Sequence, residues 1–484
     1  MYFRKKIFHI FNQFRQVSKD VPAPYKAYYK SREISDRSYL CHAPFNNMYF
    51  NSLGEVANCW LTFDDPEYYD GTKSIKEIWF GDKFNRLREA IKEYDLSYKC
   101  NTCKNHIKSG NFINVLARAY DNEYPVIEYP TMIEFELSNT CNLECTMCTG
   151  LLSSVIRKNR EKLPALKSPY GDRFIEELRE FIPYLKEARF NGGEPFLIHI
   201  YYKIWDLIYE LNPDLKIIVA TNGTVLTERV KKYLERGNFH INLSIDSLDP
   251  VLYSQIRVNG DLNEVLKNFY YFKRYCAENQ RNLCIMVNPM RQNWKGMSDF
   301  INFCNEHNVH VWFNTIVKPY DQAIWTLPAA ELQNIYSTLT NVKLKPCGRT
   351  SRGLYTYNTG IFSNFVHKQI KTWMEEAIAR ENIQHLHAAG KSELELFEHS
   401  VKNLIQLQFK QESEAAAATA VLEEKITFIN DYLQDKIPHE VYYRRLNSVN
   451  LASVFIFLLE SPPEKIIEVL NHFIAQYQSG VPGE

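Results

Sequence analysis

Residues 131–150 read TMIEFELSNTCNLECTMCTG, a strand-like segment that runs into three cysteines. Apolar and acidic residues alternate in its first half, which predicts a β-strand. The strand leads into a C-x3-C-x2-C motif formed by Cys141, Cys145 and Cys148. Three thiolates on a short loop can hold three irons of a [4Fe–4S] cluster and leave the fourth iron without a protein ligand. A zinc site completed from elsewhere and three core cysteines are the alternatives.

A second motif lies about 45 residues downstream, where residues 187–197 read EARFNGGEPFL. A short strand is predicted to run into Gly192, Gly193 and Glu194. Two glycines allow a ligand to approach the backbone closely, and a glutamate can accept hydrogen bonds from an ammonium group. The alternative is an ordinary strand-to-helix turn with an exposed glutamate.

In this order and separation, the two motifs resemble the radical S-adenosylmethionine (SAM) superfamily, from about Thr131 to Val317. The resemblance implies that the three cysteines hold the cluster and that SAM chelates the open iron through its amino and carboxylate groups. It implies that the turn with Gly192, Gly193 and Glu194 contacts the SAM amino group. Cleavage of SAM then gives a 5′-deoxyadenosyl radical that abstracts a substrate hydrogen. Met147 stands where many members have an aromatic residue, and it can still cover the adenine.

Softer motifs extend the resemblance to further cofactor contacts. ATNGT (220–224) contains Asn222, and SID (244–246) contains Ser244 and Asp246; both fall where the family often contacts the SAM ribose and carboxylate. Arg257, in YSQIR, resembles an arginine that binds the carboxylate. Each residue also has an ordinary interpretation as a turn or cap residue. No general base is assigned.

The strand pattern around these motifs predicts an α/β fold. Strand-like segments alternate with helical ones, which favours a parallel sheet. Several strands are apolar on one face and polar at their carboxyl ends, as in HINLSID (240–246), which fits a barrel with a polar interior better than a doubly wound sheet. We therefore predict a partial (β/α)6 TIM-type barrel, open on one side, with strands at 132–138, 187–191, 216–221, 240–246, 283–288 and 310–316.

A second cysteine set precedes the barrel, with the spacing C-x17-C-x40-C-x2-C. Four thiolates can close the coordination sphere of zinc or of an iron–sulfur cluster, and spacing does not choose between them. The segment contains, in order, a Pro-Phe step, a Gly turn, an EIW helix and a terminal CxxC motif. This order is similar to that of twitch/SPASM domains, and the resemblance implies an auxiliary [4Fe–4S] cluster. In that family the domain usually follows the barrel. The predicted ligands are Cys41, Cys59, Cys100 and Cys103.

Four segments follow from these patterns: a basic amphipathic helix and linker (1–34), a small α+β auxiliary-cluster domain (35–125), the radical SAM barrel (126–345) and an all-α domain (346–484). Lys+Arg and Asp+Glu both total 57, which removes the bulk electrostatic argument for nucleic-acid binding. The 484 residues contain no apolar run long enough to span a membrane. Eleven cysteines without a secretory signal favour a reducing, cytoplasmic location.

The expected function is therefore that of a radical SAM enzyme whose auxiliary cluster accepts an electron from the substrate. We predict modification of a peptide or protein. The alternatives are dehydrogenation of a small molecule or sugar by the same chemistry, and a non-catalytic iron–sulfur or zinc protein that carries electrons or binds a partner. The resemblance implies a flavodoxin- or ferredoxin-type electron donor.

Overall fold

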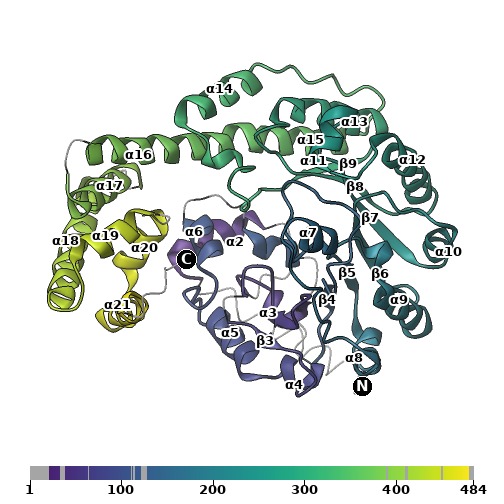
Figure 1. Cartoon of the computed structure of the whole chain (residues 1–484), viewed down its shortest axis with the longest axis horizontal. Coiled ribbons are helices and arrows are strands. Elements are labelled where there is room, and N and C mark those ends of the chain that lie inside the picture. The colour runs from purple at the N-terminus through teal and green to yellow at the C-terminus, as the bar shows by residue number, and fades with distance from the viewer. Residues whose placement is uncertain are drawn as a thin grey trace, which may run out of the picture. The chain divides into compact units, whose positions relative to one another are not determined.

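The computed structural model describes residues 21–32, 39–63, 65–108, 110, 112, 115–121, 128–388, 391–408, 412–448 and 451–478. The chain forms two compact units (Figure 1): the first runs to Thr326 and includes Asn334–Ile370, and the second comprises Leu327–Gln333 and the chain from Lys371 onward. The amphipathic helix predicted near the N-terminus lies outside the described residues.

The first unit is built on one sheet with the strand order β3-β2-β1-β4-β5-β6-β7-β8-β9. All six predicted barrel strands are present, and each pairs in parallel with the next. They are β4 (Met132–Phe135), β5 (Glu187–Phe190), β6 (Lys216–Thr221), β7 (Asn238–Ser244), β8 (Leu283–Val287) and β9 (His310–Phe313). The predicted α/β partial barrel is confirmed.

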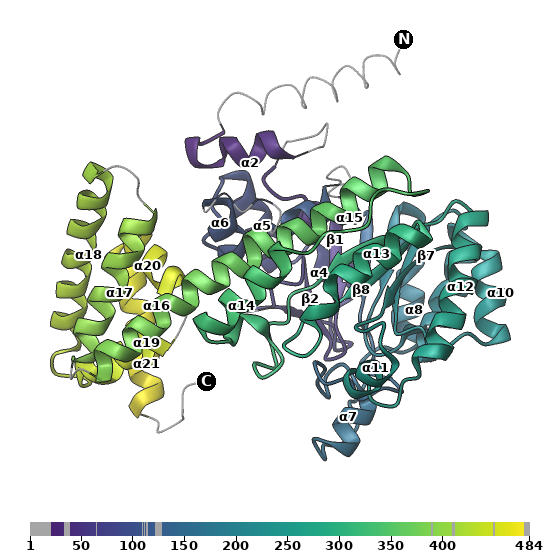
Figure 2. The ribbon, with the colours of Figure 1, turned by 90° about the horizontal axis from the view of Figure 1, so that it is seen from above.

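Helices follow the strands and cover the outer face of the sheet (Figure 2). Two of these helices start at capping side chains: the Thr227 hydroxyl accepts a hydrogen bond from Val230 N, and the Asp261 carboxylate accepts one from Asn263 N. Phe239 of β7 is buried against Trp205 of α9, with ring centroids 5.3 Å apart. The four helices are α9 (His199–Leu211), α10 (Glu228–Arg236), α12 (Leu262–Glu278) and α13 (Met297–His307).

The cysteine-rich segment continues the barrel sheet. β1 (Asn47–Phe50) pairs in parallel with β4 and antiparallel with β2 (Glu55–Ala57), which in turn pairs with β3 (Glu67–Tyr68). β1 and β2 form a hairpin whose turn needs Gly54, the glycine of the turn noted in the sequence, because its φ is +85°. The parallel pairing with β4 was not predicted. It satisfies the backbone groups of a strand that would otherwise be an open barrel edge.

The opposite edge of the sheet is covered by α15 (Arg352–Asn364). Asn358 is fully buried there: its Oδ1 accepts a hydrogen bond from Val311 N at 3.1 Å, and its Nδ2 donates to Val309 O at 3.0 Å. The side chain thus pairs with the backbone beside β9. The segment that we predicted as a C-terminal domain beginning at residue 346 is therefore divided, because α15 belongs to the first unit and the second resumes at Lys371.

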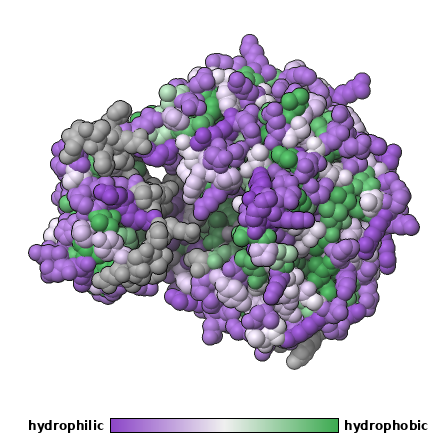
Figure 3. All heavy atoms as spheres, in the orientation of Figure 1, coloured by the Kyte–Doolittle hydropathy of each residue, from purple (hydrophilic) through white to green (hydrophobic). Residues whose placement is uncertain are grey.

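The second unit is helical around its own apolar core, which includes Phe397, Leu422, Ile429, Tyr443 and Leu470. Among the described residues, no helix has the length and apolarity needed to cross a bilayer. Much of the molecular face shown in Figure 3 is hydrophilic, with smaller apolar areas between. The helices are α16 (Lys371–Ala388), α17 (Glu393–Gln408), α18 (Glu412–Leu433), α19 (His439–Ser448), α20 (Leu451–Glu460) and α21 (Pro463–Gln478).

Candidate metal centres and cofactor site

The three-cysteine loop begins at the carboxyl end of β4 and closes on itself through polar side chains. Asn139 Nδ2 donates to Gly150 O at 2.8 Å, which ties the start of the loop to its end. Ser153 is the N-cap of α7 (Ser154–Asn159), and its hydroxyl donates to Leu143 O at 2.8 Å. These bonds fix the path of the backbone that carries the thiols.

The middle of the loop is anchored to a distant part of the barrel. Glu144 N donates to Val258 O at 3.0 Å and Thr146 N donates to Ile256 O at 2.9 Å, just after α11 (Pro250–Ile256). The guanidinium of Arg160 also donates to the Cys148 carbonyl at 3.0 Å. Arg160 was not among the predicted site residues, because nothing in the local pattern separates it from an ordinary basic residue near a helix end.

The thiols of this loop lie in an environment that disfavours free thiolates. Burial raises the pKa of Cys148 to about 12, and the neighbouring Cys145 and Cys141 raise it further. Burial likewise raises the pKa of Cys145 to about 11. The three thiols lie on one short loop, whose start and end are tied together by the Asn139–Gly150 hydrogen bond. Three ionised thiols in this place need bound cations, and iron ions supply that charge, so the donor set fits an iron–sulfur cluster.

The glycine motif is held directly against the cysteine loop. Gly193 N donates to Ser138 O at 3.1 Å, and Glu194 N donates to Thr140 O at 2.7 Å. A Cβ at position 193 would lie 2.2 Å from Thr140 O, and one at 192 would lie 2.6 Å from Ser138 O. We expected these glycines to admit a ligand. The close approach that the structure shows is that of the chain's own backbone, which joins the two motifs into one site.

Glu194 is completely buried, which rules out the exposed turn that was its alternative interpretation. Its carboxylate accepts hydrogen bonds from Thr221 Oγ1 at 2.8 Å, Asn222 N at 2.7 Å and Phe196 N at 3.2 Å. Burial raises the pKa of Glu194 to about 7, although these donors lower it. The side chain therefore ties the end of β5 to the end of β6, and its contact with SAM stays a prediction.

Three other predicted cofactor residues gather at the same edge of the sheet. Asn222 Nδ2 lies 3.9 Å from Cys141 Sγ. Asp246 Oδ2 lies 2.6 Å from Nη2 of Arg257, and both side chains are buried. Burial lowers the pKa of Arg257, but Asp246 and Cys145 raise it by more, so the guanidinium stays charged beside the cysteine loop.

The remaining predicted residues occupy the border of this site. Ser244 is half-buried at the end of β7. Met147 packs against an apolar cluster that includes Ile256, Met290 and Ile316. These contacts form an apolar wall beside the cysteine loop. A side chain that covers the adenine of SAM needs such an apolar setting. Residues that we did not predict also contribute, since Asn293 Nδ2 donates to the Asp246 carbonyl at 2.8 Å.

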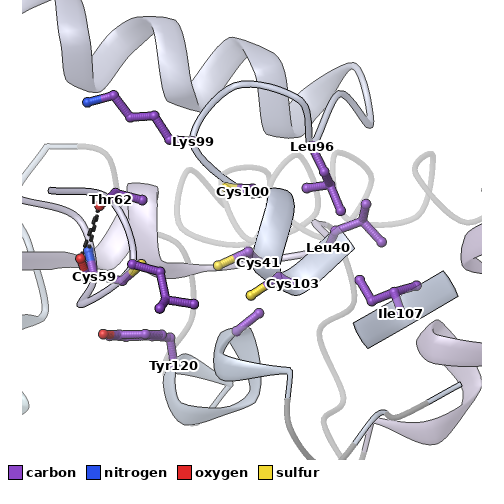
Figure 4. A pocket seen from close by; sticks show the side chains of 12 residues that line it. Leu40, Cys41, Cys59, Thr62, Leu96, Lys99, Cys100, Cys103, Ile107 and Tyr120 are labelled. Carbon is purple, nitrogen blue, oxygen red and sulfur yellow. Dashed lines mark hydrogen bonds between the residues drawn. The ribbon is translucent and has the colours of Figure 1, made fainter. Parts of the chain in front are cut away.

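The four cysteines of the second set line a single pocket (Figure 4). Cys41 precedes α3 (Ala43–Asn46), Cys59 follows β2, and Cys100 and Cys103 lie at the start of α6 (Asn101–Lys108). Burial raises the pKa of Cys59 to about 12. The rest of the wall is largely apolar and includes Leu40, Leu61, Leu96, Ile107 and Ala117.

Among the described residues, no group of three or more His, Cys, Asp or Glu side chains is arranged to hold a single metal ion. Thiolates around one zinc ion lie about 2.3 Å from it and are therefore near one another. The ligands of a four-iron cube are spread more widely around it. The four thiols of the pocket face a common space between separate elements, and four thiolates of this kind can ligate an iron–sulfur cluster or zinc.

Comparison with known proteins agrees with this geometry. Residues 135–304 match the radical SAM superfamily, and residues 41–104 match an iron–sulfur cluster-binding domain, SPASM. The matched ranges contain all seven predicted metal ligands. The radical SAM domain implies a [4Fe–4S] cluster with SAM, and the second domain implies auxiliary iron–sulfur binding.

Curated relatives cover part of the chain. GTP 3′,8-cyclase of Limosilactobacillus fermentum is 24% identical over 199 residues, which are 41% of this chain and 57% of that protein. GTP 3′,8-cyclase of Clostridium perfringens (strain SM101) is 30% identical over 162 residues, which are 33% of this chain and 46% of that protein. The chain thus spans about half the length of the curated relatives it matches.

Two solved structures are similar to part of the fold. Native anSMEcpe with bound AdoMet has a TM-score of 0.33 and 19% identity, over 43% of this chain and 59% of that chain. Streptococcus suis SuiB bound to precursor peptide SuiA has a TM-score of 0.34 and 16% identity, over 57% of this chain and 65% of that chain. The two domain matches show that residues 135–304 form a radical SAM domain and that residues 41–104, ahead of it, form an iron–sulfur cluster-binding domain.

Proposed function

We propose that this protein is an oxidising radical SAM enzyme that acts on a peptide or protein. The observation that carries the proposal is the joint between the two motif loops, in which Gly193 and Glu194 donate to Ser138 and Thr140. Beside this joint, Asn222, which follows β6, lies 3.9 Å from the Cys141 sulfur. When bound, the cluster and SAM supply a primary carbon radical that abstracts a substrate hydrogen, and the protein's own residues orient the reactants.

Arg257 is suited to bind a carboxylate such as that of SAM. Its Nη2 contacts Asp246, yet its Nε is buried and has no hydrogen-bond partner among the described residues. Such an unpaired donor is costly unless a ligand completes it. Asp246 keeps the guanidinium in place, and the spare N–H is left for the cofactor. Met147 and its apolar neighbours exclude water from the same side.

The auxiliary pocket supports net oxidation of the substrate. A substrate radical becomes an oxidised product when it loses one electron and one proton, and a fully ligated iron–sulfur cluster is a one-electron acceptor. Four cysteines fill the ligand positions of such a cluster, which favours electron transfer over direct substrate binding. A cluster held by these four cysteines would exchange electrons with a flavodoxin- or ferredoxin-type protein, the donor class that we expect for the SAM site.

The charges in the barrel interior favour a substrate without a polyphosphate group. Arg189 lies 2.6 Å from Glu187 and 3.4 Å from Glu134, and both carboxylates are buried. Arg257 is likewise paired with Asp246. Arg189 is therefore balanced by two carboxylates and the one spare N–H of Arg257 is assigned to SAM, whereas a nucleoside triphosphate needs several unbalanced cations. Nucleotide cyclisation stays the second candidate, because the curated relatives are named GTP 3′,8-cyclases.

The proposed activity is tested by anaerobic reconstitution with iron, sulfide, dithionite and SAM. The wild-type protein and a Cys347→Ala control should form 5′-deoxyadenosine, because Cys347 lies outside both cysteine sets. Cys148→Ala should form none. Absence of 5′-deoxyadenosine from wild-type protein at full iron loading would favour a non-catalytic electron carrier.

The substrate class is tested by the rate at which 5′-deoxyadenosine forms. We expect short peptides encoded beside this gene to raise the rate and to lose two hydrogens or gain a cross-link, as measured by mass spectrometry. GTP should leave the rate unchanged. A rise with GTP alone would overturn the peptide assignment and favour the nucleotide.

A further inference from the structure

Glu136 lies just after β4, where the chain leaves the sheet for the cysteine loop. Its backbone N donates to Phe50 O at 2.8 Å, so the pairing of β1 with β4 reaches this residue. A Cβ at position 192 would lie 3.6 Å from Glu136 Cγ, which makes the side chain a neighbour of the glycine motif. The carboxyl ends of the strands are the part of an α/β barrel where catalytic side chains gather.

The side chain of Glu136 points into the barrel. Successive residues of a strand face opposite sides of the sheet. Phe135 lies on the outer side, where it packs against Phe174 of α8 (Asp172–Leu178) with ring centroids 6.4 Å apart. Glu136 therefore faces inward, like Glu134, which lies 3.4 Å from Arg189 of the next strand.

The inner face of the sheet is accessible to solvent. Buried and partly exposed residues alternate along β6, β7 and β8. The buried set includes Phe239, which packs against Trp205 on the helix-covered side, so the partly exposed set faces inward. That set includes Asn242 and Ser244, and Glu136 is partly exposed as well. A substrate inside the barrel can therefore reach Glu136.

One oxygen of the Glu136 carboxylate is held and the other is open. Oε2 accepts a hydrogen bond from the Tyr49 hydroxyl at 2.6 Å. The Tyr49 ring is itself buried and packs edge-on against Phe63, with centroids 5.3 Å apart. Oε1 has no hydrogen-bond partner in the part of the chain that the structure describes, and it is not sealed from solvent. The tyrosine thus fixes the carboxylate and leaves Oε1 as the oxygen that can accept a proton.

The other inward-facing carboxylates near this edge are already occupied. Glu134, Glu194 and Asp246 each have both oxygens in hydrogen bonds or ion pairs. Among these four acidic side chains, Glu136 is the one with an oxygen to spare.

The groups around Glu136 adjust its affinity for a proton. Burial raises the pKa of Glu136 to about 7, the hydrogen bond from Tyr49 lowers it, and the charge of Glu134 raises it. Burial raises the pKa of Tyr49, Tyr170 and Tyr201 well above the usual value, so these phenols stay neutral. A carboxylate of this kind is ionised above neutral pH and can take up a proton there. The titratable groups nearby are Tyr49 of β1, Glu134 of β4, Arg189 of β5, Tyr201 of α9 and Tyr170.

We propose that Glu136 is the general base of the substrate oxidation and that Tyr49 is its positioning residue. The inference rests on the proposed function, in which a hydrogen atom is removed from a substrate carbon. One electron then passes from that carbon to the proposed auxiliary cluster, and the proton on the adjacent atom moves to Glu136 Oε1. The bond from that atom to hydrogen breaks, an O–H bond forms, and a double bond joins the atom to the carbon.

The test uses the full chain reconstituted with iron and sulfide, together with SAM, dithionite and synthetic peptides encoded beside the gene. Glu136→Gln keeps the shape of the side chain and an acceptor for Tyr49, but its amide does not take up a proton. This variant should hold as much iron as wild type and form 5′-deoxyadenosine at a similar rate. Oxidised peptide should form at least about 100-fold more slowly, as for loss of a general base.

Two variants serve as controls. Glu136→Asp should recover part of the rate, because it restores a carboxylate. Glu210→Gln should behave as wild type, because Glu210 is exposed on α9, where it lies 2.8 Å from Arg179.

The pH dependence provides a second readout. Peptide oxidation by wild type should rise through about pH 7 and then level off, because only the ionised carboxylate accepts the proton. Tyr49→Phe should move this midpoint to higher pH, since it removes the donor that favours the carboxylate. An unchanged midpoint in Tyr49→Phe would contradict its positioning role.

The possible failures are distinguishable. Peptide oxidation by Glu136→Gln at the wild-type rate would overturn the role of Glu136 alone. A raised KM with unchanged kcat would show that Glu136 binds the peptide instead, and loss of 5′-deoxyadenosine would show that it positions SAM; either result overturns the base. If iron-loaded wild type forms 5′-deoxyadenosine and oxidises no peptide, the proposed function falls and this inference falls with it.

Discussion

Replacement of Gly193 by alanine should separate the two motif loops. The new Cβ would lie 2.2 Å from Thr140 O, whereas ordinary contacts begin at 3.4 Å, so the loops must move apart by about 1.2 Å. That movement breaks the bonds from Gly193 N to Ser138 O and from Glu194 N to Thr140 O. Two hydrogen bonds are worth about 1 kcal/mol each, and overpacking costs about 1–3 kcal/mol. The free energy of unfolding should therefore fall by about 3–5 kcal/mol, a large share of the stability of a typical domain.

Urea denaturation of the iron-free protein, followed by tryptophan fluorescence, measures this loss. Six of the seven tryptophans precede residue 326 and therefore report on the first unit. Gly353→Ala is the matched control, because this helical glycine has no atom within 4 Å of the new Cβ, and it should be neutral or slightly stabilising. The reasoning is refuted if Gly193→Ala unfolds within about 0.5 kcal/mol of wild type, which is the usual effect of a surface substitution.

Three further outcomes are expected. Asp246→Asn should lower the free energy of unfolding by about 3–5 kcal/mol, because it leaves Arg257 charged, buried and unpaired. Adding Arg257→Met should recover part of this loss in a double-mutant cycle, and strictly additive effects of the two substitutions would contradict the pairing. Burial raises the pKa of Glu136 to about 7, although the hydrogen bond from Tyr49 lowers it. The protonated side chain therefore stabilises the fold fully below about pH 4.5, and this stabilisation is lost by pH 7. Over that range the free energy of unfolding of wild type should fall by up to about 3 kcal/mol relative to Glu136→Gln, as measured by urea midpoints. Cys100→Ala with Cys103→Ala should lower the iron content from about eight to about four per chain while 5′-deoxyadenosine still forms, and loss of both would contradict separate clusters.

The sequence predicted the barrel well because its signals are local. In β7, the alternation of apolar and polar residues was sufficient to place the strand within two residues of its observed start. Tertiary contacts were harder to predict. The parallel pairing of Asn47 with Met132 joins segments far apart in the chain, and no short pattern encodes it.

The glycine motif shows the same limit in the site. Small residues at positions 192 and 193 indicate a close approach, but they do not say whether a ligand or the chain's own backbone makes it. Asn358 is a comparable case, because an amide in a helix gives no sign that it will pair with the edge of a sheet. Cysteine spacing, in contrast, grouped all four auxiliary thiols correctly around one pocket.

The pairing of β1 with β4 has a consequence for biosynthesis. The ribosome makes Cys41 and Cys59 well before Met132 emerges, and the β1–β2 hairpin is too small to be stable by itself. The first half of the auxiliary pocket therefore acquires a lasting shape only after β4 has been translated. A ribosome-bound chain that ends before β4 should therefore lack the sheet edge against which this half of the pocket is built.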